Sequence, residues 1–292
     1  MLSLLLGPFL WMQIMTTQDL LKLQSPPADQ RIAYGADPLQ FGELRLPPGK
    51  GPHPVAVVIH GGCWQAAFGL DHIGSLGAAL AQAGIAAWTI EYRRIGNPGG
   101  GWPGTFQDAG RGVDHVRELA RKYPLDLRRV VVMGHSAGGH LALWVAARRR
   151  LPKDSPVAAG DPLALRGAVS LAGVPDLRQG AVQHVCGNAV EQLLGGSATE
   201  FPERYRQGSP AELLPLSVPQ VLLHGALDSI VPPTFSETYG AAAKKAGDSV
   251  RLQILPGAGH FELIAPKSAA WPAVLEAVQS LLRQEPARVP TR

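Results

Sequence analysis

The sequence predicts an α/β fold in which helices cover both faces of a largely parallel sheet. Short runs rich in valine, isoleucine and alanine recur along the chain, and segments with helical spacing of apolar residues separate them. The apolar runs show little polar alternation, which is expected of strands that are buried on both faces. Because helices lie between the runs, crossover connections should make neighbouring strands parallel.

The elements are expected in a regular order. The first strand, at 41–46, alternates apolar and polar residues, so we place it at an antiparallel edge of the sheet. The apolar runs predict further strands at 55–59, 85–90, 129–133, 167–171, 218–223 and 250–255. Helical spacing predicts helices at 70–83, 106–122, 137–147, 234–246 and 268–282.

Length and composition favour one domain. The chain has 292 residues, of which 46% are apolar and 17% charged, so a single domain with a large core is expected. We assign residues 31–292 to this domain and residues 1–30 to an N-terminal segment that is partly disordered or docks on the domain. The polar stretch at 176–215 contains glycine and proline and is longer than ordinary connections, so we expect a cap or lid over the site there.

Charge and cysteine content bear on partners and location. The net charge is +4, but the basic residues are scattered and no nucleic-acid-binding motif accompanies them, so no nucleic-acid partner is expected. Cys63 and Cys186 are the only cysteines and form no CxxC motif or disulfide framework, which favours a reducing, cytoplasmic location.

The first residues leave the location open. Residues 1–15 are apolar but shorter than the roughly 20 residues that span a bilayer, so no stable membrane insertion is expected. They lack a basic start and a small-residue cleavage site. A docking segment and extra residues upstream of a start at Met15 are two interpretations. If the segment instead acts as a signal, the protein is secreted or periplasmic.

Residues 134–138, Gly-His-Ser-Ala-Gly, fit the pattern G-x-S-x-G. The pentapeptide stands where its chemistry requires it, after the strand at 129–133 and before the helix at 137–147. A sharp turn from strand to helix would strain the serine, and Gly134 and Gly138 let the backbone turn without side-chain clashes. We therefore predict that Ser136 is a catalytic nucleophile.

A serine nucleophile needs a base, and the base needs a carboxylate that orients it. Asp228 follows the strand at 218–223, and His260 follows the strand at 250–255. The order Ser136, Asp228, His260 is the chain order expected for these three roles. Because the carboxyl ends of parallel strands lie at one edge of a sheet, we expect the three side chains to meet there.

The segment His60-Gly61-Gly62-Cys63-Trp64 directly follows the strand at 55–59, where an oxyanion-binding loop is expected. Backbone N–H groups in such a loop can stabilise the transition state by several kcal/mol. We predict that His60 braces the loop rather than acting as a base, and no pattern supports Cys63 as a thiol nucleophile. The predicted oxyanion donors are the backbone amides of Gly62, Cys63 and Ala137.

Four aromatic residues adjoin these motifs and are predicted to line a substrate pocket, with ordinary core packing as the alternative: Trp64, Phe68, Trp102 and Phe261. The remaining histidines have no metal-binding spacing, and the glycines form no nucleotide-binding pattern. Neither a metal nor another cofactor is therefore expected. The expected partner is a small-molecule ester or amide, bound by a monomer or a homodimer.

In these motifs the chain resembles the α/β-hydrolase family, and more narrowly its small esterase and arylformamidase-like branch with an HGG-type oxyanion loop. The resemblance covers about 41–282 and is carried by HGGCW, EYR at 91–93, GHSAGG, HGALDSIVP and GAGHFEL. It implies an eight-stranded, mostly parallel sheet. Cys63 stands where the hormone-sensitive-lipase pattern HGGG has its third glycine, and this variant is more similar to kynurenine formamidases and feruloyl-esterase-like proteins.

The resemblance also implies a reaction, the hydrolysis of esters, or less often amides, through an acyl-enzyme. The resulting expectation is a serine hydrolase that acts as a cofactor-independent carboxylesterase. An arylformamidase that cleaves N-formylkynurenine, a small S9-like peptidase and a catalytically silent binding module remain as alternatives.

Overall fold

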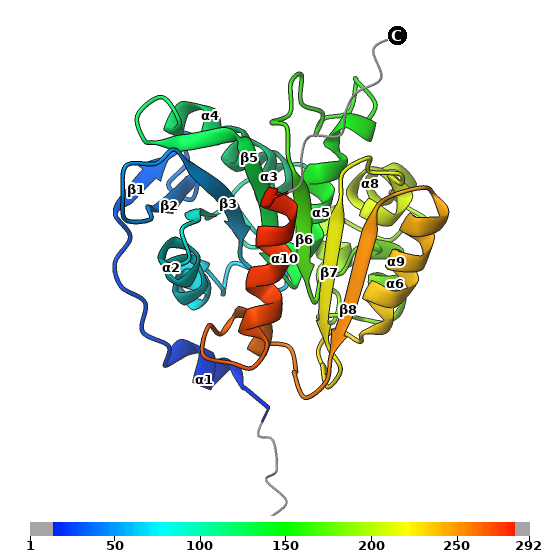
Figure 1. Ribbon diagram of the computed structural model, residues 1–292. Helices are drawn as coiled ribbons and strands as arrows, with labels where there is room; N and C mark the ends of the chain where they lie inside the picture. The colour runs from blue at the N-terminus through cyan, green and yellow to red at the C-terminus, as the bar shows by residue number, and fades with distance from the viewer. Residues whose placement is uncertain (1–13, 284–292) are drawn as a thin grey trace, which may run out of the picture.

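The computed structural model describes residues 14–283, which contain an eight-stranded sheet (Figure 1). The strands lie in the order β1-β2-β4-β3-β5-β6-β7-β8. The pairs from β4 to β8 are parallel, whereas β1 pairs antiparallel with β2, and β2 with β4. The bounds are β1 Gln30–Ala33, β2 Phe41–Arg45, β3 His53–Ile59, β4 Ala86–Ile90, β5 Leu125–His135, β6 Gly167–Leu171, β7 Gln220–Gly225 and β8 Val250–Leu255.

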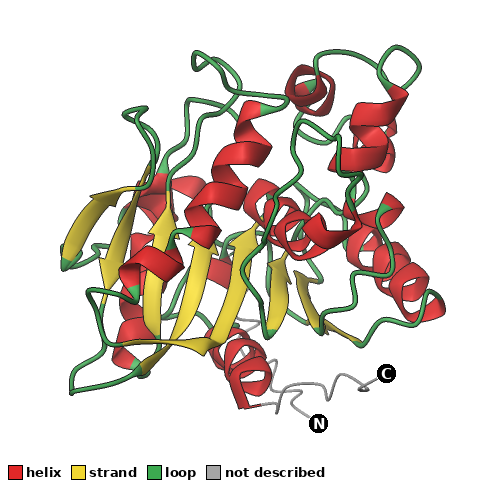
Figure 2. Ribbon diagram, turned by 90° about the horizontal axis from the view of Figure 1, so that it is seen from above, coloured by secondary structure: helices red, strands yellow, loops and turns green. Residues whose placement is uncertain are grey.

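Helices cover both faces of the sheet, as the view from above shows (Figure 2). One face carries α2 (Gly74–Gln82) and α10 (Trp271–Arg283). The other carries α3 (Gly104–Asp114), α5 (Ala137–Ala147) and α9 (Thr234–Lys245). The shorter elements are α1 Thr17–Leu21, η1 Leu70–Ile73, α4 Val116–Leu119, η2 Arg148–Arg150, α6 Leu177–Val182, α7 Ala189–Leu194, α8 Pro202–Gly208, η3 Pro210–Glu212 and η4 Glu262–Ile264.

The sheet separates two apolar cores, and β3 shows why its sequence lacks polar alternation. Val55, Val57 and Ile59 belong to one core cluster, whereas Ala56 and Val58 belong to the other. Successive side chains of a strand point to opposite faces, so both sets must be apolar when both faces are covered. The predicted α/β fold with a mostly parallel, eight-stranded sheet is confirmed.

Two strands depart from what the sequence predicts. The sequence does not predict β1, because only two of its four residues, Gln30–Ala33, are apolar and the strand is mostly exposed at the edge of the sheet. β8 lies at the opposite edge, and its side chains alternate between exposed and half-buried positions. A strand at an edge of this sheet therefore needs fewer apolar residues than a central one.

Residues 176–215 do form an insertion between β6 and β7, which contains α6, α7 and α8. Its side chains pack into the same core as α5, where Leu177, Leu193 and Tyr205 are fully buried. None of its residues is among the described residues that line the cavity beside Ser136. The apolar side chains of the insertion are used in the core, and a role of the insertion as a lid stays a prediction.

The N-terminal segment is described only from residue 14 onward, so the expectations for residues 1–13 fall outside the described residues. The short helix α1 begins after Thr16, whose side chain accepts a hydrogen bond from the amide of Asp19 in a capping box. Leu20 of this helix is 2% exposed. Within residues 14–283, no helix combines the length and the apolar character that crossing a membrane requires.

Candidate active site

Ser136 lies in the sharp turn between β5 and α5 and has an unusual backbone conformation. Its φ is 56° and its ψ is −121°, a combination that costs energy in a residue with a side chain. A Cβ atom on Gly134 would collide with the carbonyl oxygen of Gly138, and one on Gly138 would collide with that of Ile59. The strained turn with two obligatory glycines, predicted from the sequence, is therefore present.

His260 and Asp228 form a hydrogen-bonded pair. His260 Nδ1 lies 2.6 Å from Asp228 Oδ2. An ionised carboxylate only accepts hydrogen bonds, so Nδ1 carries the proton and Nε2 keeps the lone pair that a general base uses. Burial raises the pKa of Asp228, but hydrogen bonds from His224 and His260 outweigh this effect and hold the pKa well below its usual value. The carboxylate is therefore ionised and orients the imidazole.

His224 supports this carboxylate, a role that the sequence analysis missed. His224 Nε2 lies 3.3 Å from Asp228 Oδ2 and 2.8 Å from the carbonyl oxygen of Val231. Both neighbours are acceptors, so Nε2 carries the proton, and Nδ1 accepts from the hydroxyl of Ser236 at 2.8 Å. Asp228 Oδ1 accepts from the amides of Ile230 and Val231, each at 2.9 Å. A histidine four residues before the aspartate, at the end of the same strand, is the signal that could have indicated this role.

The loop after β3 contains three successive residues with positive φ, namely Gly62 at 105°, Cys63 at 54° and Trp64 at 55°. Gly62 and Cys63 line the same cavity as Ser136. Their amides have no backbone acceptor among the described residues. Ala137 is the first residue of α5, so its amide has no partner within the helix. The three amides predicted as oxyanion donors therefore have no backbone acceptor among the described residues.

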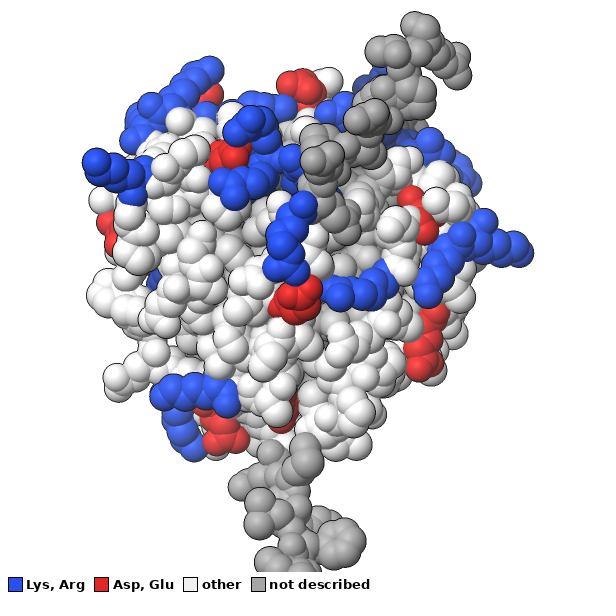
Figure 3. Space-filling model, viewed as in Figure 1, with Lys and Arg blue, Asp and Glu red and all other residues white. Residues whose placement is uncertain are grey.

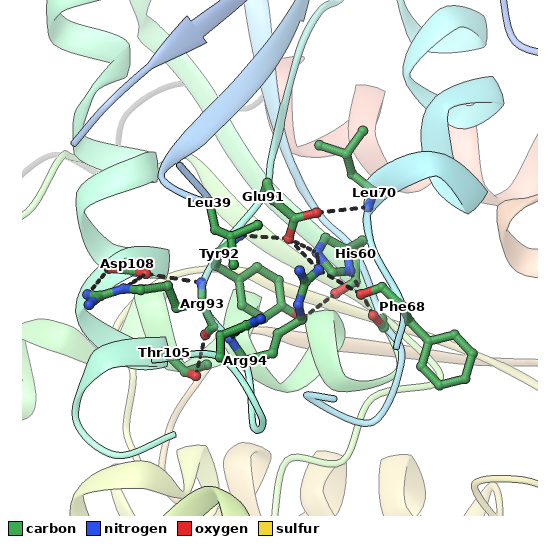
Figure 4. A network of polar contacts seen from close by, with 12 residues as sticks. Leu39, His60, Phe68, Leu70, Glu91, Tyr92, Arg93, Arg94, Thr105 and Asp108 are labelled. Carbon is green, nitrogen blue, oxygen red and sulfur yellow. Dashed lines mark hydrogen bonds and ion pairs between the residues drawn. The ribbon is translucent and has the colours of Figure 1, made fainter. Parts of the chain in front are cut away.

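A buried polar network holds this loop in place (Figure 4). Glu91, at the end of β4, accepts from Arg94 at 2.5 Å and lies 2.8 Å from His60 Nε2. Its second oxygen accepts from the amide of Leu70 at 3.2 Å, and Arg94 also donates to the carbonyl oxygen of Phe68 at 2.6 Å. Burial raises the pKa of Glu91, but His60 and Arg94 outweigh this effect and lower it to about 2. The ionised Glu91 thus links His60, at the start of the loop, to Leu70, at its end.

Replacing Glu91 with glutamine is expected to loosen the loop. The change leaves the buried Arg94 guanidinium without a counter-charge, which should cost about 3–5 kcal/mol of stability. Misplaced oxyanion donors should lower kcat by about 10- to 100-fold, with less effect on KM. Thermal unfolding and steady-state ester hydrolysis measure both effects. Glu118→Gln, which removes an exposed ion pair with Arg121, is the control. An unchanged kcat in folded Glu91→Gln would contradict the bracing role.

The two cysteines form a disulfide, although the sequence shows no disulfide framework. Cys63 is bonded to Cys186, with their Cα atoms 5.8 Å apart, a normal separation for a disulfide. No motif indicated this pairing, because the two residues lie 123 positions apart in the chain. Cys186 lies between α6 and α7. The bond therefore joins the insertion to the loop that carries two predicted oxyanion donors.

A cavity of about 360 Å³ adjoins the site, and Ser136 and His260 both line it. Two of the four aromatic residues predicted as pocket walls, Phe68 and Phe261, are in its lining. His72 and residues of α1 also line it, although the sequence analysis did not predict this. Within residues 14–283, no cluster of histidine, cysteine and acidic side chains is placed to bind a metal ion.

The other two predicted pocket aromatics lie elsewhere, so their assignment is wrong. Trp64 is 1% exposed, and its indole nitrogen donates to His140 Nδ1 at 3.2 Å. Trp102 packs edge-on against Phe106, with ring centroids 5.1 Å apart. Both side chains pack with the core on the α5 side of the sheet. Closeness to a motif in sequence does not fix which way a side chain points.

The chain is similar to several known proteins. Residues 43–242, more than half of the chain, match the model of the BD-FAE family. A probable isoprenylcysteine alpha-carbonyl methylesterase of Arabidopsis thaliana is 26% identical over 82% of this chain and 52% of its own length. The esterase LipQ of Mycobacterium tuberculosis is 28% identical over 81% of this chain and 56% of its own. The chain thus spans about half the length of these curated relatives.

Solved structures share the fold. A truncated carbohydrate esterase from gut microbiota has a TM-score of 0.74 at 20% identity, covering 88% of this chain and 99% of that one. A thermophilic esterase from Thermogutta terrifontis has a TM-score of 0.68 at 22% identity, covering 88% of this chain and 94% of that one. With its fold, its strained serine turn and a family match over most of its sheet, the chain belongs to the BD-FAE family of α/β-hydrolase esterases.

Proposed function

We propose that the protein is a carboxylesterase, a serine hydrolase that cleaves carboxylic esters through an acyl-enzyme on Ser136. The main support is one arrangement of side chains. Ser136, in its strained turn, lines the same cavity as His260, whose ring is oriented by the ionised Asp228. Relatives that are named esterase and carboxylic ester hydrolase support the same class of reaction.

The proposed reaction has two halves. His260 Nε2 removes the proton from Ser136 Oγ while Oγ attacks the carbonyl carbon of the ester. The carbonyl oxygen becomes an oxyanion, which accepts hydrogen bonds from the amides of Gly62, Cys63 and Ala137. When this intermediate collapses, the bond to the alcohol oxygen breaks, and His260 returns the proton to that oxygen. Water then attacks the acyl-enzyme by the same steps, which releases the acid and restores the serine.

Esters are proposed ahead of N-formylkynurenine, the substrate that the arylformamidase alternative implies. N-formylkynurenine carries a carboxylate, whereas no lysine or arginine stands among the described residues that line the cavity. A charge that loses water without gaining a partner weakens binding. We expect purified protein to show a higher kcat/KM for p-nitrophenyl acetate and butyrate than for N-formylkynurenine. The opposite ranking would favour the formamidase, and turnover of none of them would favour a binding module.

The disulfide bears on the compartment in which the enzyme acts. Disulfides persist in oxidising compartments and are rare in the cytosol. The Cys63–Cys186 bond therefore favours the secreted or periplasmic alternative over the expected cytoplasmic location. Alkylation of free thiols in freshly lysed native cells tests this proposal, because two labelled cysteines per chain would support the cytoplasm instead.

A further inference from the structure

Part of the cavity beside Ser136 is built by the helix α1. Thr17, Leu20 and Leu21 of this helix belong to the cavity wall. In Figure 1, α1 lies at the lower end of the molecule, below α2 and α10. The helix precedes residues 43–242, the segment that matches the family model, so the family match assigns it no role.

Two sets of contacts hold α1 against the segment that carries His260. The amide of Met15 donates to Glu262 Oε1 at 2.5 Å, and Glu262 Oε2 accepts from the amide of Gly259 at 2.9 Å. The side chain of Leu20 is buried in the core that α10 covers. The helix is therefore a fixed wall of the site, positioned together with the predicted catalytic base.

Exposed apolar side chains converge on the opening of this cavity. Leu21, Phe68 and Ile230 are 64%, 40% and 41% exposed, and all three line the cavity. They come from three segments that are far apart in the sequence. A single exposed apolar side chain is ordinary, but several around one opening indicate a surface that a ligand covers. An apolar ligand group would remove these side chains from water, which is favourable.

The charges around the cavity disfavour an anionic ligand. Among the described lining residues, Asp71 is acidic and exposed, and none is a lysine or arginine. Burial, assisted by the nearby His60, lowers the pKa of His72 to about 4, so this lining residue is uncharged at neutral pH. On the face shown in Figure 3, lysine and arginine gather mainly over the upper part. Near α1, Lys22 is paired with Asp19 at 3.1 Å and is not part of the cavity lining.

We propose that the site selects uncharged esters that carry a compact apolar group, and that Leu21, Phe68 and Ile230 determine this specificity. The inference rests on the proposed esterase function. A volume of about 360 Å³ lies near the lower end of the range of about 300–1,000 Å³ that small-molecule sites span. Such a cavity holds a short aliphatic chain or one aromatic ring.

The test follows kcat/KM as one apolar group of the ester lengthens. The acyl group is varied in p-nitrophenyl acetate, butyrate and hexanoate, and the alcohol in methyl, butyl and hexyl acetate. In the series whose variable group enters the cavity, we expect kcat/KM to rise about threefold per methylene up to four carbons. Mono-p-nitrophenyl succinate, an anionic ester of the same chain length, should be hydrolysed at least about tenfold more slowly than the butyrate.

Two variants test whether Leu21 and Phe68 cause the increase in kcat/KM per methylene. In Leu21→Ser/Phe68→Ser, the increase per methylene should fall below about 1.5-fold. The matched control is Leu127→Ser, because Leu127 is 38% exposed on β5 and is not part of the cavity lining, so the wild-type slope should be kept. Thermal unfolding verifies that each variant is folded. The inference alone is overturned if the double variant keeps the wild-type increase in kcat/KM per methylene. It is also overturned if the wild-type enzyme hydrolyses the acetate fastest in every series. Hydrolysis of no ester at all overturns the proposed function and the inference with it.

Discussion

Ser136→Ala is expected to lower kcat for p-nitrophenyl butyrate by about 10⁴- to 10⁶-fold. The substitution removes the oxygen that forms the acyl-enzyme and leaves only binding and the oxyanion donors to assist direct attack by water. The fold should survive, because the change removes one oxygen atom and leaves the backbone of the turn as it is. Steady-state kinetics and thermal unfolding of the purified variant measure both expectations.

A covalent label gives a second readout for the nucleophile. An organophosphonate ester should add one group per wild-type chain, on the peptide that contains Ser136, and none to Ser136→Ala. Ser155→Ala is the matched control, because Ser155 lies in a loop outside the cavity lining, where its hydroxyl donates to Gln207. Full activity of Ser136→Ala would place the nucleophile at another residue.

Asp228→Asn is expected to lower kcat by about 10⁴-fold while KM changes little. An asparagine can present its NH₂ group to His260 Nδ1, which moves the ring proton to Nε2 and removes the lone pair that accepts the serine proton. The substitution also removes the negative charge that stabilises the imidazolium formed during the reaction. Steady-state kinetics of the purified variant on p-nitrophenyl butyrate measure the loss.

A second buried aspartate separates this catalytic effect from a structural one. Asp248 is 8% exposed and accepts hydrogen bonds from the amides of Leu216 and Ser217, each at 2.8 Å. Asp248→Asn should therefore lower the melting temperature and leave kcat of the folded enzyme unchanged. If both variants lost the same fraction of kcat, Asp228 would act through the fold rather than through His260.

The path of the backbone through the site could be predicted because local sequence restricts it strongly. The run before Gly134 is apolar on both faces, as expected of a strand that is covered on both faces. The glycines on either side of Ser136 permit a turn that residues with a Cβ atom would block. The same holds for the ends of β7 and β8, where Asp228 and His260 follow segments that the sequence predicts as strands. In each case the sequence neighbours of the residue determine its place.

The missed features depend on contacts between distant segments. Trp64 and Phe68 lie four residues apart in one loop, yet the first side chain enters the core and the second lines the cavity. The disulfide of Cys63 and the contribution of α1 to the cavity likewise arise only when separate parts of the chain pack together. Sequence periodicity reports which element a residue belongs to, but not which distant residue it meets.

The bond between Cys63 and Cys186 closes part of the polypeptide into a covalent ring. Ser136 belongs to this ring, which spans residues 63–186, whereas Asp228 and His260 lie in the part of the chain that follows it. A single proteolytic cut in the loop at 151–160, where residues 152–154 are exposed, would open the ring without releasing a piece. The two fragments would migrate together until a reductant was added. A single cut between Cys186 and Asp228 would instead separate the chain into two fragments even without a reductant, because no covalent link would then join the nucleophile to its base.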